Sequence, residues 1–276
     1  DSFSKSVQLG QGLEATGRLS RASMTRTVNA LRICRQKLSR HGVKHMRLVA
    51  TEATRRALNG AHFLRQVKRE ASLTLEVITP EEEARLAVIS CAPLVSTRTE
   101  QLLVVDIGGG STALVWIDLT NVPARARAHA IMRLHSGFKS DPGPFAAAKV
   151  VDWISVPLGV ATLRDQFADV EDDAARFALR SWFFEESLAD FAPSECEQQR
   201  EGFQIIGTSG TVTTVAASHL GLKRYDRTKV DGLRMTSDQI DAVIREYLLL
   251  VMQIYLLFLL SHERPSLQMV RKLIDK

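Results

Sequence analysis

The feature that most constrains the fold is an apolar run ending in an aspartate and three glycines, LLVVDIGGGST at residues 102–112. A second loop of this kind, IIGTSGT, follows at residues 205–211. Each joins a buried-strand pattern to a turn that glycine makes readily, and successive backbone N–H groups in such a turn hold anions. The second loop is also expected to open a helix at Thr211, whose free N–H groups favour phosphate. Together the loops predict a cleft that grips a phosphate chain from two sides.

Asp106 stands at the carboxyl end of the first of these strands, where ligand sites of open α/β sheets lie. A carboxylate there can hold Mg²⁺ beside a phosphate, or it can simply bond its own turn. Neither loop contains the Gly-Lys-Ser/Thr of a Walker A motif or the spacing GxGxxG. The order of strand, glycine loop and hairpin is instead similar to the phosphate loops of actin-like proteins.

Apolar periodicity and turn residues predict an α/β fold with a mixed sheet, in two lobes joined near residue 95. Expected strands are 46–50, 73–78, 102–106, 112–117, 125–134 and 203–206. Expected helices are 20–41, one from Thr79, one from about Gly159, 172–191, 211–220 and one capped by Ser237. Thr79, Pro80 and Glu82 together predict a capping box.

Composition indicates a soluble globular protein, because 45% of the 276 residues are hydrophobic and 24% are charged. Three widely spaced cysteines suit a reducing cytoplasm. The apolar run at 247–260 is 14 residues long, whereas a spanning helix needs about 20, so a buried helix and no membrane partner are expected. We expect no nucleic-acid partner, since basic residues are spread evenly and only 6% of residues are aromatic.

Two groups of charged residues have both a structural and a chemical interpretation. Glu81, Glu82 and Glu83 complement the dipole of the helix that they open, but one of them could instead be a general base for water. Arg55 and Arg56 could bind phosphate oxygens in a bidentate way, although two arginines in a helical turn are usually solvated. No Ser/His/Asp or Cys/His arrangement stands out, so covalent catalysis is not indicated.

Six motifs occur in one order along the chain, and together they resemble the exopolyphosphatase / guanosine pentaphosphate phosphohydrolase family. The motifs are LVATEATRRALN (48–59), VITPEEEARL (77–86), VVDIGGGST (104–112), VPLGVATL (156–163), IIGTSGTVTTVAA (205–217) and YDRTKVDGL (225–233). The resemblance implies two actin-like, ribonuclease-H-like lobes with the active site between them. Residues 1–95 would form a partial first lobe and residues 96–276 a second lobe.

The resemblance further implies hydrolysis of a terminal phosphoanhydride in polyphosphate or guanosine pentaphosphate with Mg²⁺, with a homodimer as one expected assembly. Glu83 matches the family's catalytic glutamate, Arg55 its phosphate-site arginine and Asp106 its metal-linked aspartate. The implied phosphate-binding loops comprise Gly108, Gly109, Gly110, Ser111, Gly207, Thr208, Ser209, Gly210 and Thr211.

The sequence departs from the family pattern in three places. Nothing in residues 1–20 matches the family's opening strand and first phosphate loop, so a truncated first lobe is expected. Ala113 stands where the family usually has a glutamate, and the likeness fades after about Arg245. An impaired relic that binds polyphosphate or nucleotide without turnover is therefore the main alternative. A sugar or acetate kinase is disfavoured, because the Glu-Glu-Ala-Arg segment has no place there.

Overall fold

The computed structural model describes residues 3–138, 148–167, 169–191 and 202–247. The chain divides into two compact units, residues 1–212 and 213–276, and each is treated by itself below. The division into lobes near residue 95 stays a prediction. The apolar run after Tyr247 and the third cysteine, Cys196, lie outside the described residues.

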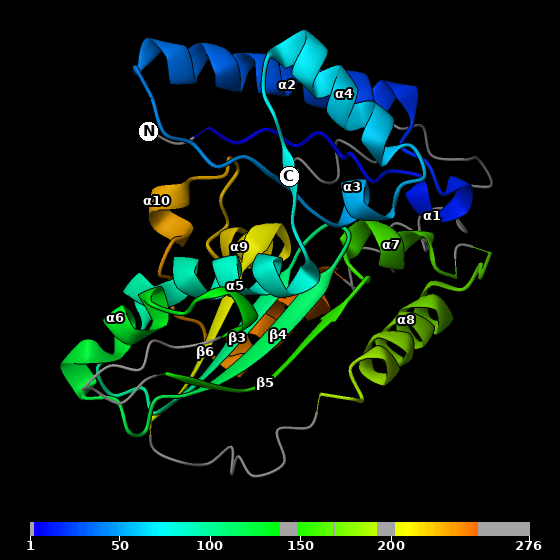
Figure 1. The fold of residues 1–276 in the computed structure, drawn as a ribbon. Coiled ribbons are helices and arrows are strands. Elements are labelled where there is room, and N and C mark those ends of the chain that lie inside the picture. The colour runs from blue at the N-terminus through cyan, green and yellow to red at the C-terminus, as the bar shows by residue number, and fades with distance from the viewer. Residues whose placement is uncertain (1–2, 139–147, 168, 192–201, 248–276) are drawn as a thin grey trace. The chain divides into compact units, whose positions relative to one another are not determined.

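The amino-terminal part of the first unit is a layer of helices. α1 spans Leu13–Thr16, α2 spans Arg21–Arg40 and α4 spans Gly60–Ala71. Ser20 caps α2 as predicted, because its hydroxyl oxygen accepts a hydrogen bond of 3.1 Å from the Ser23 N–H. α2 and α4 lie side by side (Figure 1) and bury Val28, Phe63 and Val67 between them and their neighbours.

Two very short parallel strands follow this layer. β1 (Val49–Ala50) leads into α3 (Glu52–Arg56), and β2 (Glu76–Val77) leads into α5 (Pro80–Cys91). Both strands are shorter than the predicted 46–50 and 73–78, because each strand pairs with the other over only two residues. The short ladder nevertheless places the starts of α3 and α5 at the same edge.

The main sheet has the order β5-β4-β3-β6, and it confirms an α/β fold with a mixed sheet. Its strands are β3 (Gln101–Ile107), β4 (Thr112–Asp118), β5 (Lys149–Val156) and β6 (Phe203–Thr208). β3 runs antiparallel to β4 but parallel to β6, with Asp106 opposite Thr208. Because neighbouring parallel strands end at the same edge, the glycine loops that follow β3 and β6 emerge together (Figure 1).

The predicted strand 125–134 is wrong, since this segment forms the 3₁₀ turn η2 (Ala124–Ala126) and helix α6 (Arg127–Met132). Its alternation of arginine and alanine imitates a strand, but both residue types favour helices. Ile131 and Leu134, three residues apart, enter the core instead. The third strand of the sheet is β5, which pairs with β4.

α5 covers one face of this sheet, where Ala84 and Val88 pack against Val104 and Val115. Because side chains alternate along a strand, Asp106 lies on the same face as Val104 and therefore toward α5. The first unit also contains η1 (Ala92–Leu94), η3 (Ser136–Phe138), α7 (Val160–Asp165) and α8 (Asp173–Ser187).

The helix α9 (Ser209–His219) leads from the first unit into the second, which also contains α10 (Arg227–Val230) and a helix at 237–247. Ser237 does not cap that last helix as predicted. Thr236 does, because its hydroxyl accepts from the Gln239 N–H at 3.3 Å while the Gln239 side chain accepts from the Thr236 N–H at 2.9 Å. Across the described residues, no helix combines the length and apolar character needed to span a bilayer.

Candidate active site

The two glycine loops meet at the edge of the sheet where β3 and β6 end. The Gly108 N–H donates to the Ser111 carbonyl at 2.9 Å, which closes the first loop. A methyl group placed on Gly108 would lie 3.9 Å from Ser209 Oγ in the second loop. The helix after this second loop begins at Ser209, two residues before the predicted Thr211, so Ser209, Gly210 and Thr211 form its first turn.

The start of α7 binds the backbone carbonyls of the first loop. The Val160 N–H donates to the Gly108 carbonyl at 3.2 Å, and the Ala161 N–H donates to the Gly109 carbonyl at 2.8 Å. The carbonyl and N–H of a trans peptide point in opposite directions, so the N–H groups of Gly109 and Gly110 face away from α7. This arrangement aims the loop's donors at the open side, where an anion can bind.

Gly159 makes this contact possible. A Cβ at this position would lie 2.5 Å from the Gly108 oxygen and 2.6 Å from backbone atoms of Gly109 and Gly110. The sequence indicated Gly159 only as a helix start, because its contact partners lie about 50 residues earlier in the chain. Thr112 adds a further tie, as its hydroxyl donates to the Leu158 carbonyl at 2.7 Å.

Asp106 lies between the two loops with an unsatisfied oxygen. Its Oδ1 is buried and has no hydrogen-bond partner, while the Ser209 hydroxyl bonds to the same carboxylate. Burial raises the pKa of Asp106, and the bond from Ser209 opposes that rise. On the adjacent strand, the residue opposite Asp106 is the buried Ala113, which adds no polar group.

An unpartnered buried carboxylate oxygen fits a bound cation, so the residues present are compatible with Mg²⁺ at Asp106. In the described part of the chain, no three His, Cys, Asp or Glu residues gather as a metal cage. Mg²⁺ does not require such a cage, because it commonly binds one or two carboxylates together with substrate phosphates and water.

Ser209 has a backbone φ of 75°, a left-handed conformation that costs a non-glycine residue about 1–2 kcal/mol. Such strain is concentrated at functional sites, where the surrounding structure maintains it. Here it places the Ser209 hydroxyl against Asp106. Its neighbour Gly207 is needed for space, since a Cβ there would lie 2.7 Å from the Val212 side chain.

Glu83 belongs to the first turn of α5 and contacts Arg55 of α3. Arg55 Nη2 lies 3.2 Å from Glu83 Oε2, and Arg55 Nη1 donates to the carbonyl of Ile78. Burial raises the pKa of Glu83; the charge of Arg55 opposes the rise and the charge of Asp106 adds to it. The charge of Asp106 thus influences the Glu83 carboxyl, and Arg55 links the first turn of α5 to α3.

Glu52 is a member of this cluster that the sequence did not single out. Its Oε2 accepts a 2.6 Å hydrogen bond from Arg55, and its Oε1 lies 3.5 Å from Arg56. Its aliphatic part packs against Gly110, where an added Cβ would lie 3.6 Å from Glu52 Cγ. The spacing of Glu52 from the two arginines, three and four residues, is the only signal in the sequence.

Glu82 has a structural role, in agreement with its interpretation as a helix-start residue. It lies 2.6 Å from Arg85 and 2.6 Å from Arg47, and the bond from Arg85, more than that from Arg47, lowers the pKa of Glu82 to about 2. The predicted capping box is only half formed. The Thr79 hydroxyl accepts from the Glu82 N–H at 3.2 Å, but the Glu82 side chain turns to the arginines.

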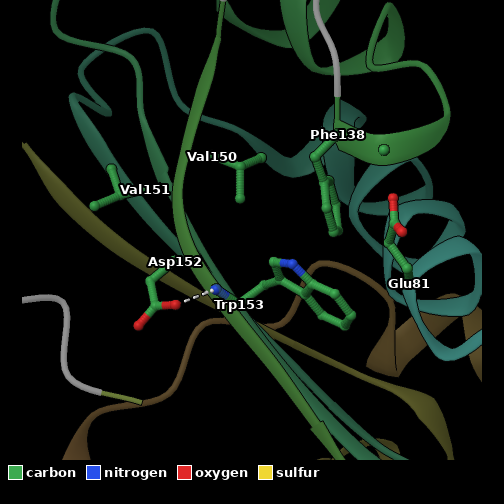
Figure 2. A pocket seen from close by; sticks show the side chains of 7 residues that line it. Glu81, Phe138, Val150, Val151, Asp152 and Trp153 are labelled. Carbon is green, nitrogen blue, oxygen red and sulfur yellow. Dashed lines mark hydrogen bonds between the residues drawn. The ribbon is translucent and has the colours of Figure 1, made fainter. Parts of the chain in front are cut away.

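A pocket of about 380 Å³ lies beside α5 (Figure 2), and none of Glu83, Arg55, Asp106 and the two glycine loops lines it. Its walls are Glu81, Gly137, Phe138 and residues 150–153 of β5. A bulge in β5 shifts the register between Val150 and Asp152, and in Figure 2 Val150 and Trp153 consequently point to the same side, toward Phe138. The rings of Phe138 and Trp153 lie 5.6 Å apart.

Comparison with known proteins identifies relatives of the whole arrangement. The model of the Ppx/GppA phosphatase family matches residues 2–267. The match extends past Arg245, where the motifs alone indicated that the likeness fades.

Two curated proteins are similar in sequence. A guanosine-5'-triphosphate,3'-diphosphate pyrophosphatase of Aeromonas salmonicida is 29% identical over 83% of this chain and 40% of its own length. A putative exopolyphosphatase of Haemophilus influenzae is 28% identical over 76% of this chain and 56% of its own length. The chain thus spans about half the length of these relatives.

Solved structures are similar as well. A crystal structure of the Aquifex aeolicus member of the Ppx/GppA family is 30% identical, with a TM-score of 0.57 over 86% of this chain and 66% of that one. An exopolyphosphatase-like protein is 28% identical, with a TM-score of 0.70 over 88% of this chain and 68% of that one. The fold class predicted from the sequence, an actin-like α/β fold, is confirmed.

Proposed function

Because the chain belongs to the Ppx/GppA phosphatase family, we propose that it hydrolyses terminal phosphoanhydride bonds of inorganic polyphosphate or guanosine pentaphosphate. The observation that carries this proposal is the link between Glu83 and the first glycine loop: Arg55 bonds to both Glu83 and Glu52, and Glu52 packs against Gly110. The carboxyl groups of Glu83 and Asp106 both have a raised pKa, and perturbed carboxyl groups occur often at active sites. Localisation in the cytoplasm stays a prediction from the cysteines, and dimer formation stays a prediction from the resemblance.

In the proposed reaction, water attacks the terminal phosphorus and Glu83 accepts the proton of that water. The bridging P–O bond to the terminal phosphorus breaks, so that inorganic phosphate and the shortened chain are released. A raised pKa makes the Glu83 carboxylate a stronger base toward the proton of the attacking water. Arg55 holds the Glu83 carboxylate in place, and its guanidinium is positioned to move onto a phosphate oxygen. Phosphoryl transfer depends mainly on positioning and on stabilising charge, which these groups provide.

The loops would bind the phosphates beyond the scissile bond. The N–H groups of Gly109 and Gly110, together with Ser111, would face the anion from one side, and Gly207 to Thr211 would face it from the other. When bound, Mg²⁺ would be held by Asp106 and phosphate oxygens and would supply positive charge to the leaving group.

One observation favours the alternative, a binding protein with impaired catalysis. Ala113 faces Asp106 across the ladder and is 8% exposed, so no second carboxylate reaches the unsatisfied Oδ1 from β4. A single carboxylate would hold a cation weakly without a substrate phosphate. Under this alternative, phosphate chains bind at the loops but are not cleaved.

The two possibilities are separated by phosphate release from long-chain polyphosphate and from guanosine pentaphosphate in the presence of Mg²⁺. In Glu83→Gln we expect kcat to fall by about 10²–10⁴-fold with little change in binding, because the general base is lost. Glu81→Gln is the matched control, as it changes the charge of the same helical turn without touching Arg55, and it should retain activity within about threefold.

Turnover that survives Glu83→Gln, or that falls equally in both variants, would remove Glu83 from the proposed role. Tight binding of tripolyphosphate by the parent chain, with no release of phosphate from either substrate, would instead establish the impaired form.

A further inference from the structure

The excess of basic over acidic residues is concentrated in one segment of the chain. The expectation that basic residues are spread evenly is therefore wrong. Residues 15–75 contain 14 of the 36 Lys and Arg residues but only 2 of the 31 Asp and Glu residues. The remainder of the chain therefore has more acidic than basic residues, although the whole has a net charge of +5. A charge separation of this kind points to an anionic partner for one face.

The structure gathers these residues on the packed helices α2 and α4 and on the exposed segment 41–47. We call this set the basic surface. Its exposed basic side chains are Arg21, Arg26, Arg32, Arg35, Arg40, Lys44, Arg47, Arg65, Lys68 and Arg69. Within the described residues, no carboxylate pairs with Arg21, Arg35, Arg40, Arg65 or Lys68. Glu70, which pairs with Arg32 and Arg69, is the single acidic residue of α2 and α4.

The basic surface is continuous along the chain with the candidate active site. Segment 41–47 leads from the end of α2 toward β1, and at its end Arg47 forms an ion pair of 2.6 Å with Glu82. Glu82 is the immediate neighbour of Glu83 on α5. An anion bound along α2 could therefore reach the first turn of α5 by following this segment.

The length of the basic surface and its lack of exposed aromatic side chains favour a long polyanion that carries no nucleobases. The 20 residues of α2 extend over about 30 Å, which exceeds what the phosphates of one nucleotide can cover. Proteins that bind single-stranded nucleic acid stack bases on aromatic rings. Between residues 15 and 75 the chain has one aromatic residue, Phe63, and it is buried.

We propose that the basic surface binds the distal part of a long inorganic polyphosphate chain whose terminal phosphate lies at Glu83. This proposal rests on the proposed function and narrows its substrate to long-chain polyphosphate. Binding along a second surface keeps the substrate attached after each terminal phosphate leaves, because the released end remains at a high effective concentration near the site.

The test compares two triple variants that remove the same charge from exposed positions of the full chain. Arg35→Gln, Arg40→Gln and Lys68→Gln alter the basic surface, while Arg98→Gln, Arg125→Gln and Lys149→Gln alter positions outside it. Affinities for long-chain polyphosphate and for tripolyphosphate are measured by fluorescence anisotropy at several salt concentrations, with EDTA present so that no turnover occurs. Melting temperatures within about 2 °C of the parent's establish that both variants are folded.

We expect the basic-surface variant to bind long-chain polyphosphate about tenfold more weakly and to bind tripolyphosphate unchanged. Removing three phosphate contacts should reduce the slope of log affinity against log salt by about 2. The control variant should change either affinity by less than about twofold. Equal weakening in the two variants, or unchanged affinity in the first, overturns the proposal.

Two further measurements distinguish this proposal from nucleic-acid binding and from the proposed hydrolysis. In the first, single-stranded RNA of equal charge competes with long-chain polyphosphate for the parent and for the basic-surface variant. The proposal is overturned if this RNA binds as tightly as long-chain polyphosphate and depends on the same three residues, because the surface would then be assigned to nucleic acid. A parent chain that binds long-chain polyphosphate through these residues but releases no phosphate from it would refute the proposed hydrolysis while supporting the docking surface.

Discussion

At the scale of single residues, Asp106 combines ligand-binding capacity with a cost to stability. Its Oδ1 is buried without a partner, and burial raises the pKa of Asp106. A carboxyl whose folded-state pKa is raised binds protons more tightly in the folded chain than in the unfolded chain. The free energy of unfolding therefore falls as pH rises from the unfolded pKa through the folded pKa. At neutral pH the ionised Asp106 opposes folding unless a cation compensates it.

Asp106→Asn should consequently stabilise the protein while disabling the site. The amide has a similar size but no charge to desolvate, so at pH 7.5 we expect the free energy of unfolding to rise by about 1 kcal/mol and Tm by about 2 °C. Mg²⁺ should raise the Tm of the parent and leave that of the variant unchanged. The measurement is thermal denaturation with and without Mg²⁺.

Asp169→Asn, at an exposed turn, is the control for that experiment and should respond to Mg²⁺ as the parent does. The assignment of Asp106 as the cation ligand fails if Mg²⁺ stabilises Asp106→Asn as much as the parent. If Asp106→Asn is less stable than the parent at pH 7.5, the charge of Asp106 does not destabilise the folded chain.

The residues of the site differ in how far the sequence could predict them. Glu83, Asp106 and Arg55 were predicted because each belongs to a motif with recognisable neighbours. Glu52 was not, since its burial depends on Gly110, 58 residues later in the chain. The roles of Glu81 and Glu82 also depend on tertiary contacts, because a dipole argument applies to both alike.

At the scale of elements, α7 determines the shape of the first glycine loop. Two of its first N–H groups bind the carbonyls of Gly108 and Gly109, so the loop is held by a helix start rather than by its own turn alone. The backbone at Gly159 has a φ of −138°, which any residue can adopt. Space alone therefore requires glycine at this position.

Gly159→Ala should displace the loop and weaken phosphate binding. Its Cβ would lie about 2.5 Å from backbone atoms that cannot rotate away, and such overpacking typically costs about 1–3 kcal/mol. We expect the tripolyphosphate affinity to fall at least about tenfold, measured by calorimetry, alongside urea denaturation for stability.

Gly10→Ala is the control outside the site, because a Cβ there would make an ordinary contact of 3.4 Å with Ala53 and the φ is not positive. It should keep its stability within about 0.5 kcal/mol and bind tripolyphosphate as the parent does. Similar losses of affinity in the two variants would indicate general destabilisation, and that α7 has no particular role.

Elements with strong local signals were predicted well, and those with interrupted periodicity were not. The cap at Ser20 and the strands around the glycine loop were found within one or two residues. β5 was missed, because its bulge places Val150 and Trp153 on one face and so breaks the two-residue period. The segment 125–134 was misread for the opposite reason, since alternating arginine and alanine produce a strand-like period in a helix.

At the scale of the whole molecule, carboxyl groups in two environments make opposite contributions to stability. The carboxyls of the candidate active site, Asp106 and Glu83, are partly buried, and their raised pKa values favour folding at low pH. Glu82 forms ion pairs with Arg85 of the same helix and with Arg47, and the second pair joins α5 to the segment after α2. These pairs lower the pKa of Glu82 to about 2. Its stabilisation is present above the unfolded pKa of about 4.3 and is lost as pH falls through the folded value.

Glu82→Gln should therefore destabilise the chain in a pH-dependent way. At pH 7 we expect the free energy of unfolding to fall by about 1 kcal/mol, a value that allows for the partial exposure of Arg47. The difference from the parent should shrink as pH is lowered from about 5 toward about 2, because protonation removes the same charge from the parent. Urea denaturation over this range measures it. Glu81→Gln breaks no ion pair of the described residues, so its difference from the parent in free energy of unfolding should not shrink at low pH. If the difference for Glu82→Gln is the same at every pH, packing rather than charge links α5 to this segment.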